Sequence, residues 1–287
     1  MASVIGRLTS STLLITLVLA TLLVLPLWVF ALVMLAFITI ALVEFFAMVR
    51  HRGVLVHQGL SVGLGMFFTC LVVWRTLIAP GRVELTVIGQ GTTMLSWAWD
   101  IFWPMTIVVI FLRQLARQNT FEALNGIATT IFGLAYIAGL MSYFFYIRTF
   151  KNQNGALLVL YLVLVTKMGD AGALMIGKLM GRHTLMARVS PRKTVEGFIG
   201  AVLVSGLTGA MAHSLVPRFS DSALQGLVAG LVLGIFGQLG DLAESLLKRD
   251  CQVKDSSRLL PGLGGVLDVL DSLLFTAPLF YALLIYG

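Results

Sequence analysis

The chain has 287 residues, of which 58% are hydrophobic and only 11% are charged, and its mean hydropathy is +0.96. Soluble domains carry about 25% charged residues, so this composition excludes an ordinary soluble protein and predicts a polytopic membrane protein. The formal net charge of +7 would suit a nucleic-acid-binding protein. Basic cytoplasmic loops explain it more simply in a membrane protein, and we expect no nucleic-acid partner.

Long apolar segments follow one another along the chain. A spanning helix needs about 20 apolar residues. The first block, residues 11–49, is long enough for two such helices, and Pro26 offers the break between them. We therefore predict an all-α integral membrane protein, a polytopic bundle of about nine transmembrane helices. The further spans are expected at residues 56–78, 96–113, 125–147, 155–178, 196–216, 223–243 and 266–286.

The basic residues predict how this bundle lies in the membrane. Most Lys and Arg residues fall in the loops on the same side as the N-terminus, which predicts a cytoplasmic N-terminus and a catalytic cavity at the cytoplasmic side. By chemistry the chain divides into an N-terminal transmembrane region, residues 1–150, and a C-terminal catalytic transmembrane region, residues 151–287.

Two features of the apolar segments bear on helix packing. Scattered charges in the first region, such as Glu44 and Arg75, fit either helix pairing or side chains that snorkel to the interface. Gly226, Gly230 and Gly234 form a ridge of small residues, which is typical of close helix packing within a chain and leaves a dimer contact as the alternative.

Charge is concentrated near the C-terminus, in residues 238–272, which hold six of the thirteen carboxylates and four of the twenty basic side chains. On a helix, Asp241, Glu244, Ser245 and Lys248 fall at i, i+3, i+4 and i+7, so they share one face. Such an acidic face is suited to a hard cation.

A glycine-rich turn follows this acidic helix. Pro261 begins it, and its glycines let backbone N–H groups turn toward an anion without a Cβ in the way. The next predicted helix carries Asp268 and Asp271 three residues apart, on one side. Two acidic helix faces therefore flank one turn.

A second polar stretch covers residues 167–200. It begins with Lys167 and Asp170, which are spaced to pair on one helix face within an apolar segment. Such buried charges usually face a polar cavity, and a structural ion pair between helices is the alternative.

Further along this stretch, Ser190 and Pro191 are typical of a helix start, with Ser at the N-cap and Pro at the first helical position. Arg192 and Lys193 would then lie in the first turn, where a bound phosphate would explain them. An ordinary basic cytoplasmic loop explains them equally well.

Both polar stretches resemble the signature of the phosphatidate cytidylyltransferases, also called CDP-diacylglycerol synthases. The resemblance covers residues 160–287; many members carry His at the position of Leu263 and Tyr at that of Leu174, so no role of those rings is carried over. The matching C-terminal positions are Ser245, Lys248, Arg249, Lys254, Asp255, Ser256, Pro261, Gly262, Gly264, Gly265, Asp268, Asp271 and Ser272. The matching upstream positions are Asp170, Gly172, Ala173, Gly177, Gly181, Ser190, Pro191, Lys193, Thr194, Glu196, Gly197 and Gly200.

The resemblance implies transfer of the cytidylyl group of CTP to phosphatidate, with release of pyrophosphate. It points to Asp241 and Asp268 as ligands of Mg²⁺, an ion that takes few carboxylates together with phosphate oxygens. It leaves a second cation open. The expected catalytic residues are Asp241, Asp268, Lys248, Lys254 and Asp271. The expected substrate-binding residues are Ser190, Lys193, Thr194, Asp170, Arg249, Asp255, Ser256, Gly262, Gly264 and Gly265.

The expected partners are CTP, phosphatidate and membrane lipids, with a homodimer left open, and the expected location is a bacterial inner membrane. Two alternatives remain at this point. A related enzyme that uses CTP on another lipid, as a kinase or a cytidylyltransferase, would carry similar polar groups. In an ion-coupled transporter, Lys167 and Asp170 would form the coupling site.

Overall fold

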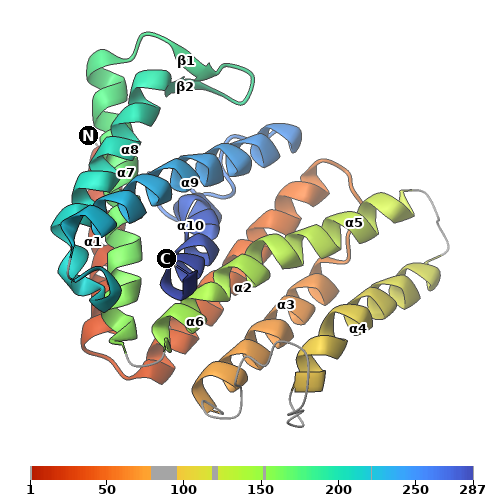
Figure 1. Cartoon of the computed structure of the whole chain (residues 1–287). Helices are drawn as coiled ribbons and strands as arrows, with labels where there is room; N and C mark the ends of the chain where they lie inside the picture. Colours follow the sequence, from red (N-terminus) through yellow and green to blue (C-terminus); the bar gives the residue numbers. More distant parts are fainter. Residues whose placement is uncertain (1, 79–95, 118–121, 151–152, 221, 287) are drawn as a thin grey trace.

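The computed structural model describes residues 2–78, 96–117, 122–150, 153–220 and 222–286, and most of them lie in helices (Figure 1). The prediction of an all-α membrane protein is confirmed. The helices are α1 (Ala2–Leu23), α2 (Leu27–His51), α3 (Gln58–Val73), α4 (Ser96–Leu115), α5 (Ala123–Gly133), α6 (Tyr143–Arg148), α7 (Gly155–Met180), α8 (Val195–Met211), α9 (Ala223–Asp250) and α10 (Val266–Tyr286). Shorter elements are the π-helical turns η1 (Trp74–Ile78) and η2 (Leu134–Gly139), the strands β1 (Thr184–Met186) and β2 (Ser190–Thr194), and the 3₁₀ turns η3 (His213–Leu215) and η4 (Pro217–Phe219).

The described residues include six helices that are long and apolar enough to cross a membrane. One of them, Ala123–Arg148, combines α5, η2 and α6. At the other three predicted positions the apolar helices are shorter, namely Thr9–Leu23, Ile101–Leu115 and Val195–Met211. The count of nine spans and their orientation therefore stay predictions.

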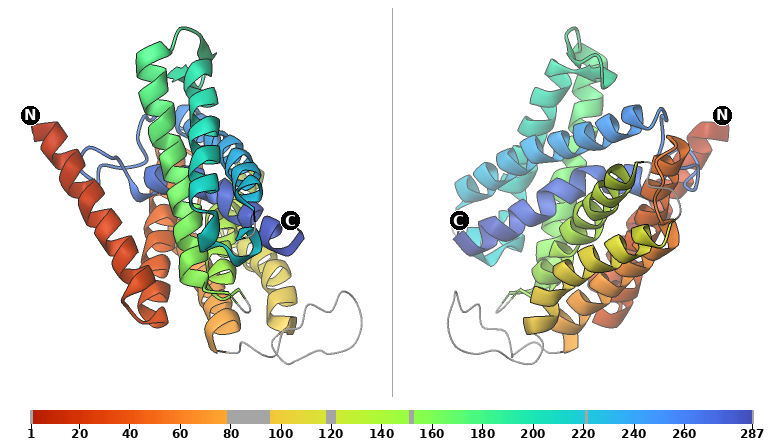
Figure 2. Two further views of the ribbon diagram at one scale, coloured as in Figure 1. Left: turned by 60° about the vertical axis from the view of Figure 1, so that its left-hand side comes forward. Right: turned by 90° about the vertical axis from the view of Figure 1, so that its right-hand side faces the viewer.

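Helices α7, α8 and α9 form a tightly packed group, seen side by side in Figures 1 and 2. A Cβ on Gly226 would overlap the carbonyl of Gly209 on α8, and one on Gly230 would overlap the carbonyl of Ser205. The ridge of small residues on α9 therefore lets the two main chains touch, as predicted for packing within one chain. An antiparallel hairpin, with Met186 paired to Ser190, joins α7 to α8.

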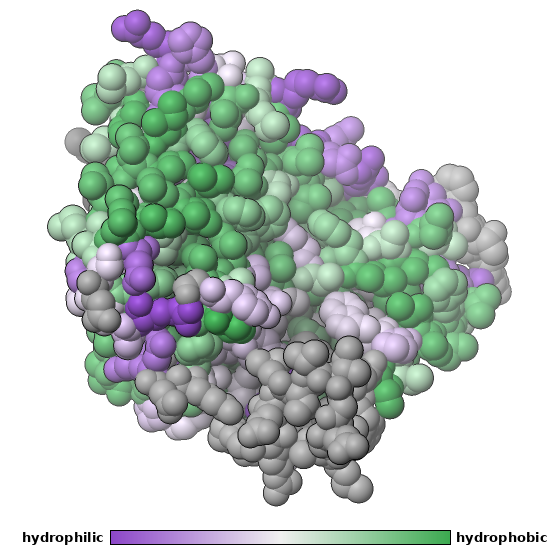
Figure 3. Space-filling view, viewed as in Figure 1, coloured by the Kyte–Doolittle hydropathy of each residue, from purple (hydrophilic) through white to green (hydrophobic). Residues whose placement is uncertain are grey.

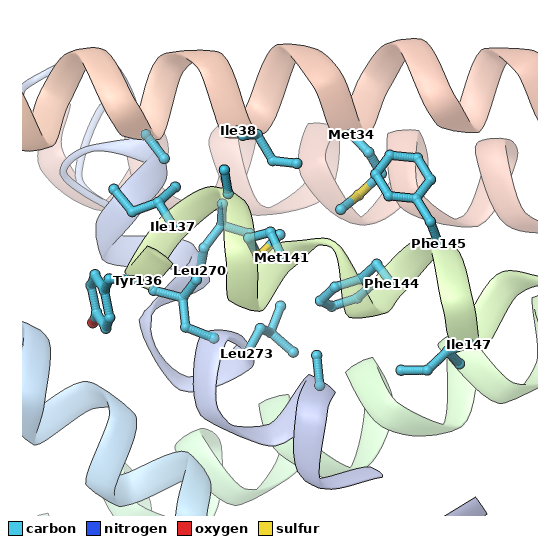
Figure 4. Packing of buried hydrophobic residues seen from close by; sticks show 14 of the residues in the cluster. Met34, Ile38, Tyr136, Ile137, Met141, Phe144, Phe145, Ile147, Leu270 and Leu273 are labelled. Carbon is cyan, nitrogen blue, oxygen red and sulfur yellow. The ribbon is translucent and has the colours of Figure 1, made fainter. Parts of the chain in front are cut away.

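Helix α10 lies between this group and the N-terminal helices. The cluster in Figure 4 shows side chains of α2, such as Ile38, facing Ile137 of η2 and Met141, with Leu270 and Leu273 of α10 on the opposite side. Two turns beyond Leu273, α10 stacks Phe280 on Tyr161 of α7, with ring centroids 5.4 Å apart. Both halves of the chain thus hold α10 in place, and this fixes the acidic residues near its start.

The outer surface suits a lipid environment. Apolar side chains cover most of the face shown in Figure 3, and hydrophilic residues gather at the end that carries the β1–β2 hairpin and in a second group at the lower left of the view. Large hydrophobic side chains on α7 and α8 are exposed, for example Leu179, Leu203 and Leu207. A membrane core accommodates such a surface, whereas water does not.

Candidate active site

The acidic face of α9 forms as predicted. Glu244 is fully buried, and Ser245 and Lys248 are 9% exposed, whereas Leu246 on the other side is 54% exposed. The polar residues therefore point into the protein and the apolar residue points outward. Such an inside-out helix is expected where a spanning helix lines a polar site.

Three carboxylates meet between α9 and α10. Oxygens of Asp241, Glu244 and Asp271 lie within 4.8 Å of one another, a grouping that could hold a metal ion. Gly240 makes this possible, because a Cβ at this position would lie 2.6 Å from the carbonyl oxygen of Asp271. Glu244 had been predicted only as part of the polar face of the helix, so the structure adds it to the candidate ligands.

Asp268 lies beside this cluster and has different partners. Lys248 forms ion pairs with both Glu244 and Asp268, and its Nζ is 2.5 Å from Asp268 Oδ1. The other oxygen, Asp268 Oδ2, accepts from the amides of Ser256 at 2.9 Å and Gly265 at 2.7 Å. The pairing of Asp241 with Asp268 as metal ligands stays a prediction, while the carboxylates that the structure clusters with Asp241 are Glu244 and Asp271.

The hairpin brings the second polar stretch to the same place. Lys193 Nζ lies 2.7 Å from Asp241 Oδ2. Arg249 Nε donates to the carbonyl of Val189, 3.2 Å away, so the end of α9 is also tied to the hairpin. Two regions about 50 residues apart in sequence therefore form one site.

The predicted helix start at Ser190 and Pro191 is wrong. Ser190–Thr194 is strand β2, and α8 begins at Val195. The cap is Thr194, whose side chain accepts from the amide of Gly197 at 3.1 Å. Thr caps helices about as well as Ser does. Because Ser190 pairs with β1, the chain stays extended up to Thr194 and the helix begins after it. Lys193 thus reaches Asp241 from a strand rather than from a helix turn.

Lys167 and Asp170 form the predicted pair, with Nζ 3.0 Å from Asp170 Oδ2. Lys167 also donates to the carbonyl of Val269 and to Ser272 Oγ, each at 2.8 Å. Gln238 donates to Asp170 at 3.3 Å. The pair thus connects α7 to α9 and α10, as the alternative of an ion pair between helices predicts. The role of Asp170 toward substrate stays a prediction.

The amides of the glycine turn have partners inside the protein. Gly264 N donates to the carbonyl of Leu260 at 3.0 Å, and Gly265 N donates to Asp268. The amide of Gly265 thus faces a carboxylate of the protein, and that of Gly264 faces a backbone carbonyl. Contact of these glycines with a substrate phosphate stays a prediction. Positive φ angles at Gly262 and Gly264, 79° and 98°, explain why glycine is needed there.

The remaining predicted residues lie at the rim or within the loop. Lys254 and Asp255 are exposed in the segment that follows α9. Ser256 is buried and donates from its amide to Asp268. Roles of Lys254 and Asp255 toward a substrate stay predictions.

Sequence reasoning placed no residue of the N-terminal region in the site, and it named Glu44 only as a charge that pairs helices or snorkels. Glu44 of α2 is 5% exposed and accepts from the amide of Val266, the first residue of α10. Tyr136, in the π-helical turn η2, is 6% exposed and has an unpartnered hydroxyl among the residues that the structure describes. Figure 4 shows this hydroxyl pointing away from the apolar cluster, toward α9. A lone carboxylate in the first apolar block was the available signal for Glu44; no pattern identified Tyr136.

Comparison with known families agrees with the two signature stretches. The model of the cytidylyltransferase family matches residues 5–286. The chain belongs to this family. The family model also matches the N-terminal region, which lies outside the two signature stretches. Glu44 and Tyr136 therefore fall within the matched part of the chain.

Curated relatives of this family member include enzymes and one protein without an assigned activity. The phosphatidate cytidylyltransferase of Staphylococcus haemolyticus is 39% identical over 85% of this chain and 97% of its own length. The phosphatidate cytidylyltransferase of Bacillus subtilis is 38% identical over 62% of this chain and 65% of its own length. The uncharacterized protein YnbB of Escherichia coli is 42% identical over 55% of this chain and 51% of its own length.

Proposed function

We propose that this protein transfers the cytidylyl group of CTP to phosphatidate, giving CDP-diacylglycerol and pyrophosphate. The observation that carries the proposal is the contact of Lys193 with Asp241, which joins the two signature stretches into one site. Membership of the cytidylyltransferase family supports nucleotidyl transfer. Relatives named phosphatidate cytidylyltransferase, aligned over 85% of the chain, support the lipid phosphate as acceptor.

The carboxylates fit a magnesium ion, which is bound through one or two carboxylates plus phosphate oxygens and water. Asp241 belongs to both candidate ligand sets, with Asp268 in the predicted pair and with Glu244 and Asp271 in the cluster. We assign Asp241 as a ligand in either set, with Asp271 as its partner across the helix interface. When bound, the ion would neutralise phosphate charge and polarise the phosphorus that is attacked.

The reaction needs no nucleophile from the protein. An oxygen of the lipid phosphate forms a bond to the α-phosphorus of CTP, and the bond from that phosphorus to the α,β-bridging oxygen breaks, so both electrons leave on pyrophosphate. The work of the chain is positioning and charge neutralisation. When no substrate is bound, carboxylates pair with Lys193 and Lys248. Both lysines are placed to pair with triphosphate oxygens once CTP binds.

The location and assembly are part of the same proposal. A lipid acceptor and an exposed apolar surface fit an integral membrane enzyme, and we propose the inner membrane of a bacterium, with the site facing the cytoplasm. Labelling of single introduced cysteines from either side of the membrane tests this orientation. The mass of the protein in detergent tests the homodimer, for which the glycine ridge of α9 offers no support because α8 covers it.

The deciding experiment is an assay of pyrophosphate release by the purified protein in detergent, with CTP, phosphatidate and Mg²⁺, omitting each in turn. The proposal predicts release only when all three are present, together with a CDP-lipid product. Formation of CDP with a lipid alcohol, and no pyrophosphate with phosphatidate, would replace this proposal with a CTP-dependent lipid kinase.

A further inference from the structure

Glu44 lies two turns before the end of the apolar helix α2, and its carboxylate accepts hydrogen bonds from residues more than 200 positions away in sequence. Glu44 Oε1 accepts from Ser257 Oγ at 2.6 Å and from the amide of Val266 at 3.0 Å. Glu44 Oε2 accepts from Ser256 Oγ at 3.1 Å and from the amide of Leu267 at 2.8 Å. Four donors therefore converge on one buried carboxylate.

Two of these donors are the first amides of α10. The first four N–H groups of a helix have no partner within the helix, and the helix dipole makes that end positive. Glu44 supplies both the acceptors and the negative charge, although it belongs to another helix. The N-terminus of α10 is thus occupied by a carboxylate of the protein, which is why this end of the helix is unsuited to bind the triphosphate.

One of the other two donors, Ser256, connects Glu44 to the carboxylates of the site. Ser256 Oγ lies 3.1 Å from Glu44 and 2.8 Å from Asp268 Oδ2, so Ser256 stands between the two acidic residues. Asp268 continues the chain of contacts to Lys248, and Lys248 to Glu244. One polar network thus runs from α2 to the carboxylate cluster on α9.

Gly265 shows how tightly this arrangement is built. A Cβ at this position would overlap Ser256 Oγ and come within 2.5 Å of Glu44 Oε2. Gly265 also donates its amide to Asp268. The carboxylate of Glu44, the turn and the carboxylate of Asp268 are therefore packed around one glycine, and a shift of any of them moves the others.

We propose that Glu44 is a positioning residue: it fixes the glycine turn and the start of α10, and so determines where Asp268 and Asp271 face α9. It is no substrate ligand, because both oxygens are engaged and only 5% of the residue is exposed. The kinetic part of this inference rests on the proposed cytidylyl transfer, whereas its structural part does not.

The test compares Glu44→Gln, Glu44→Asp and wild type. Gln keeps the size but presents an NH₂ group to donors, and Asp keeps the charge on a shorter chain. We expect Glu44→Gln to lower kcat about 10- to 100-fold and to raise the Mg²⁺ concentration for half-maximal rate, as loss of residues that orient ligands does. The KM for phosphatidate should stay within about twofold, because the lipid does not touch Glu44. Glu44→Asp should recover part of kcat.

Thr39→Val is the matched control on the same helix. It removes the bond from Thr39 Oγ1 to the carbonyl of Leu35, at 2.7 Å, and leaves the turn intact, so its kcat should equal that of wild type. Ser256→Ala breaks the same network from the loop side and should lower kcat as Glu44→Gln does. It keeps the proposal testable if Glu44→Gln does not fold.

Hydrogen exchange separates this inference from the proposed function. In the protein without substrate, Glu44→Gln should speed amide exchange in residues 256–268 and leave residues 58–73 of α3 unchanged. This result stands even if wild-type protein releases no pyrophosphate, an outcome that would remove the proposed function alone. Wild-type exchange in residues 256–268 together with wild-type kcat in Glu44→Gln would overturn the role of Glu44.

Discussion

Lys193 of strand β2 pairs with Asp241 of helix α9, with 2.7 Å between Nζ and Oδ2. Lys193 would suit the triphosphate of a nucleotide, and Asp241 would suit the magnesium ion that accompanies it. In the protein without ligand the two neutralise each other, so neither is left as a lone charge at the edge of the membrane.

Lys193→Ala should therefore raise the KM for CTP and lower kcat/KM by about 10- to 100-fold, since a charge-assisted bond to phosphate contributes roughly 1.5–3 kcal/mol. Steady-state kinetics with varied CTP checks this. Arg192→Ala removes the same charge from the neighbouring exposed position of the strand and serves as the control. Equal effects of the two changes would show that only the net charge of the hairpin matters.

Asp241→Asn and Asp271→Asn should each abolish turnover while the protein still folds. Asp271→Asn removes one of three clustered carboxylates and so relieves repulsion, and its melting temperature without metal should be unchanged or higher. Asp241→Asn relieves the same repulsion but also removes the partner of Lys193, so its melting temperature should be lower than that of Asp271→Asn. The rise of melting temperature on adding Mg²⁺ should be lost in both variants. Asp250→Asn, exposed and paired with Arg52, is the control and should keep activity. Turnover at the wild-type rate in Asp241→Asn would rule out its role as a ligand.

Asp268→Asn should also abolish turnover with little loss of folded protein. One carboxylate oxygen accepts from two amides and the other from Lys248. The carbonyl oxygen of Asn can still accept from the two amides, which keeps the fold, but the charge that pairs with Lys248 is lost. Rate measurements together with the yield of monodisperse protein check this. An active Asp268→Asn protein would leave Asp241, Glu244 and Asp271 as the complete ligand set.

Tyr136→Phe should leave thermal stability unchanged or raise it, because it removes a buried hydroxyl that has no partner among the described residues. Tyr161→Phe is the matched comparison. The Tyr161 hydroxyl donates to the carbonyl of Gly226 at 3.2 Å, so its loss should cost about 1 kcal/mol. Melting curves of the two variants in one detergent decide between the expectations. A larger loss for Tyr136→Phe than for Tyr161→Phe would contradict them.

His57, in the loop between α2 and α3, predicts a pH dependence. Burial first, and then the positive charges of Arg117 and Arg113, lower the pKa of His57 below its usual value of about 6.5. The folded state therefore disfavours the protonated ring, whereas the unfolded chain protonates it at the usual pKa. The free energy of unfolding consequently falls as the pH drops through that usual pKa. Melting temperatures at pH 7.5 and 5.5 should differ more for wild type than for His57→Asn. Equal differences would show that other groups cause the effect.

The sequence predicted the parts of the site that depend on spacing along one helix. The face shared by Asp241, Glu244 and Lys248 follows from helical periodicity, and it formed as expected. The pairing of Lys167 with Asp170 follows from the same rule. These contacts join residues three or four positions apart, which the period of the helix brings together regardless of the rest of the fold.

Contacts between distant segments could not be predicted in this way. Helical spacing does not say that Asp271, rather than Asp268, faces Asp241, because this depends on the rotation of α10 against α9. Nor does it say that Glu44 would cap α10, a contact over more than 200 residues of sequence. The start of α8 was misjudged because two good capping residues, Ser190 and Thr194, competed, and strand pairing decided between them.

The direct contact of the α8 and α9 main chains limits how this site can move. Gly226 and Gly230 have no side chains whose rotamers could change to let the helices slide. The two helices therefore shift together. Strand β2 runs straight into α8, and Asp241 lies on α9, so both ends of the ion pair with Lys193 are carried by one rigid unit. In the proposed reaction, the phosphate of a nucleotide would take the place of Asp241 on Lys193 by the swing of a single flexible side chain, while α8 and α9 stay where they are.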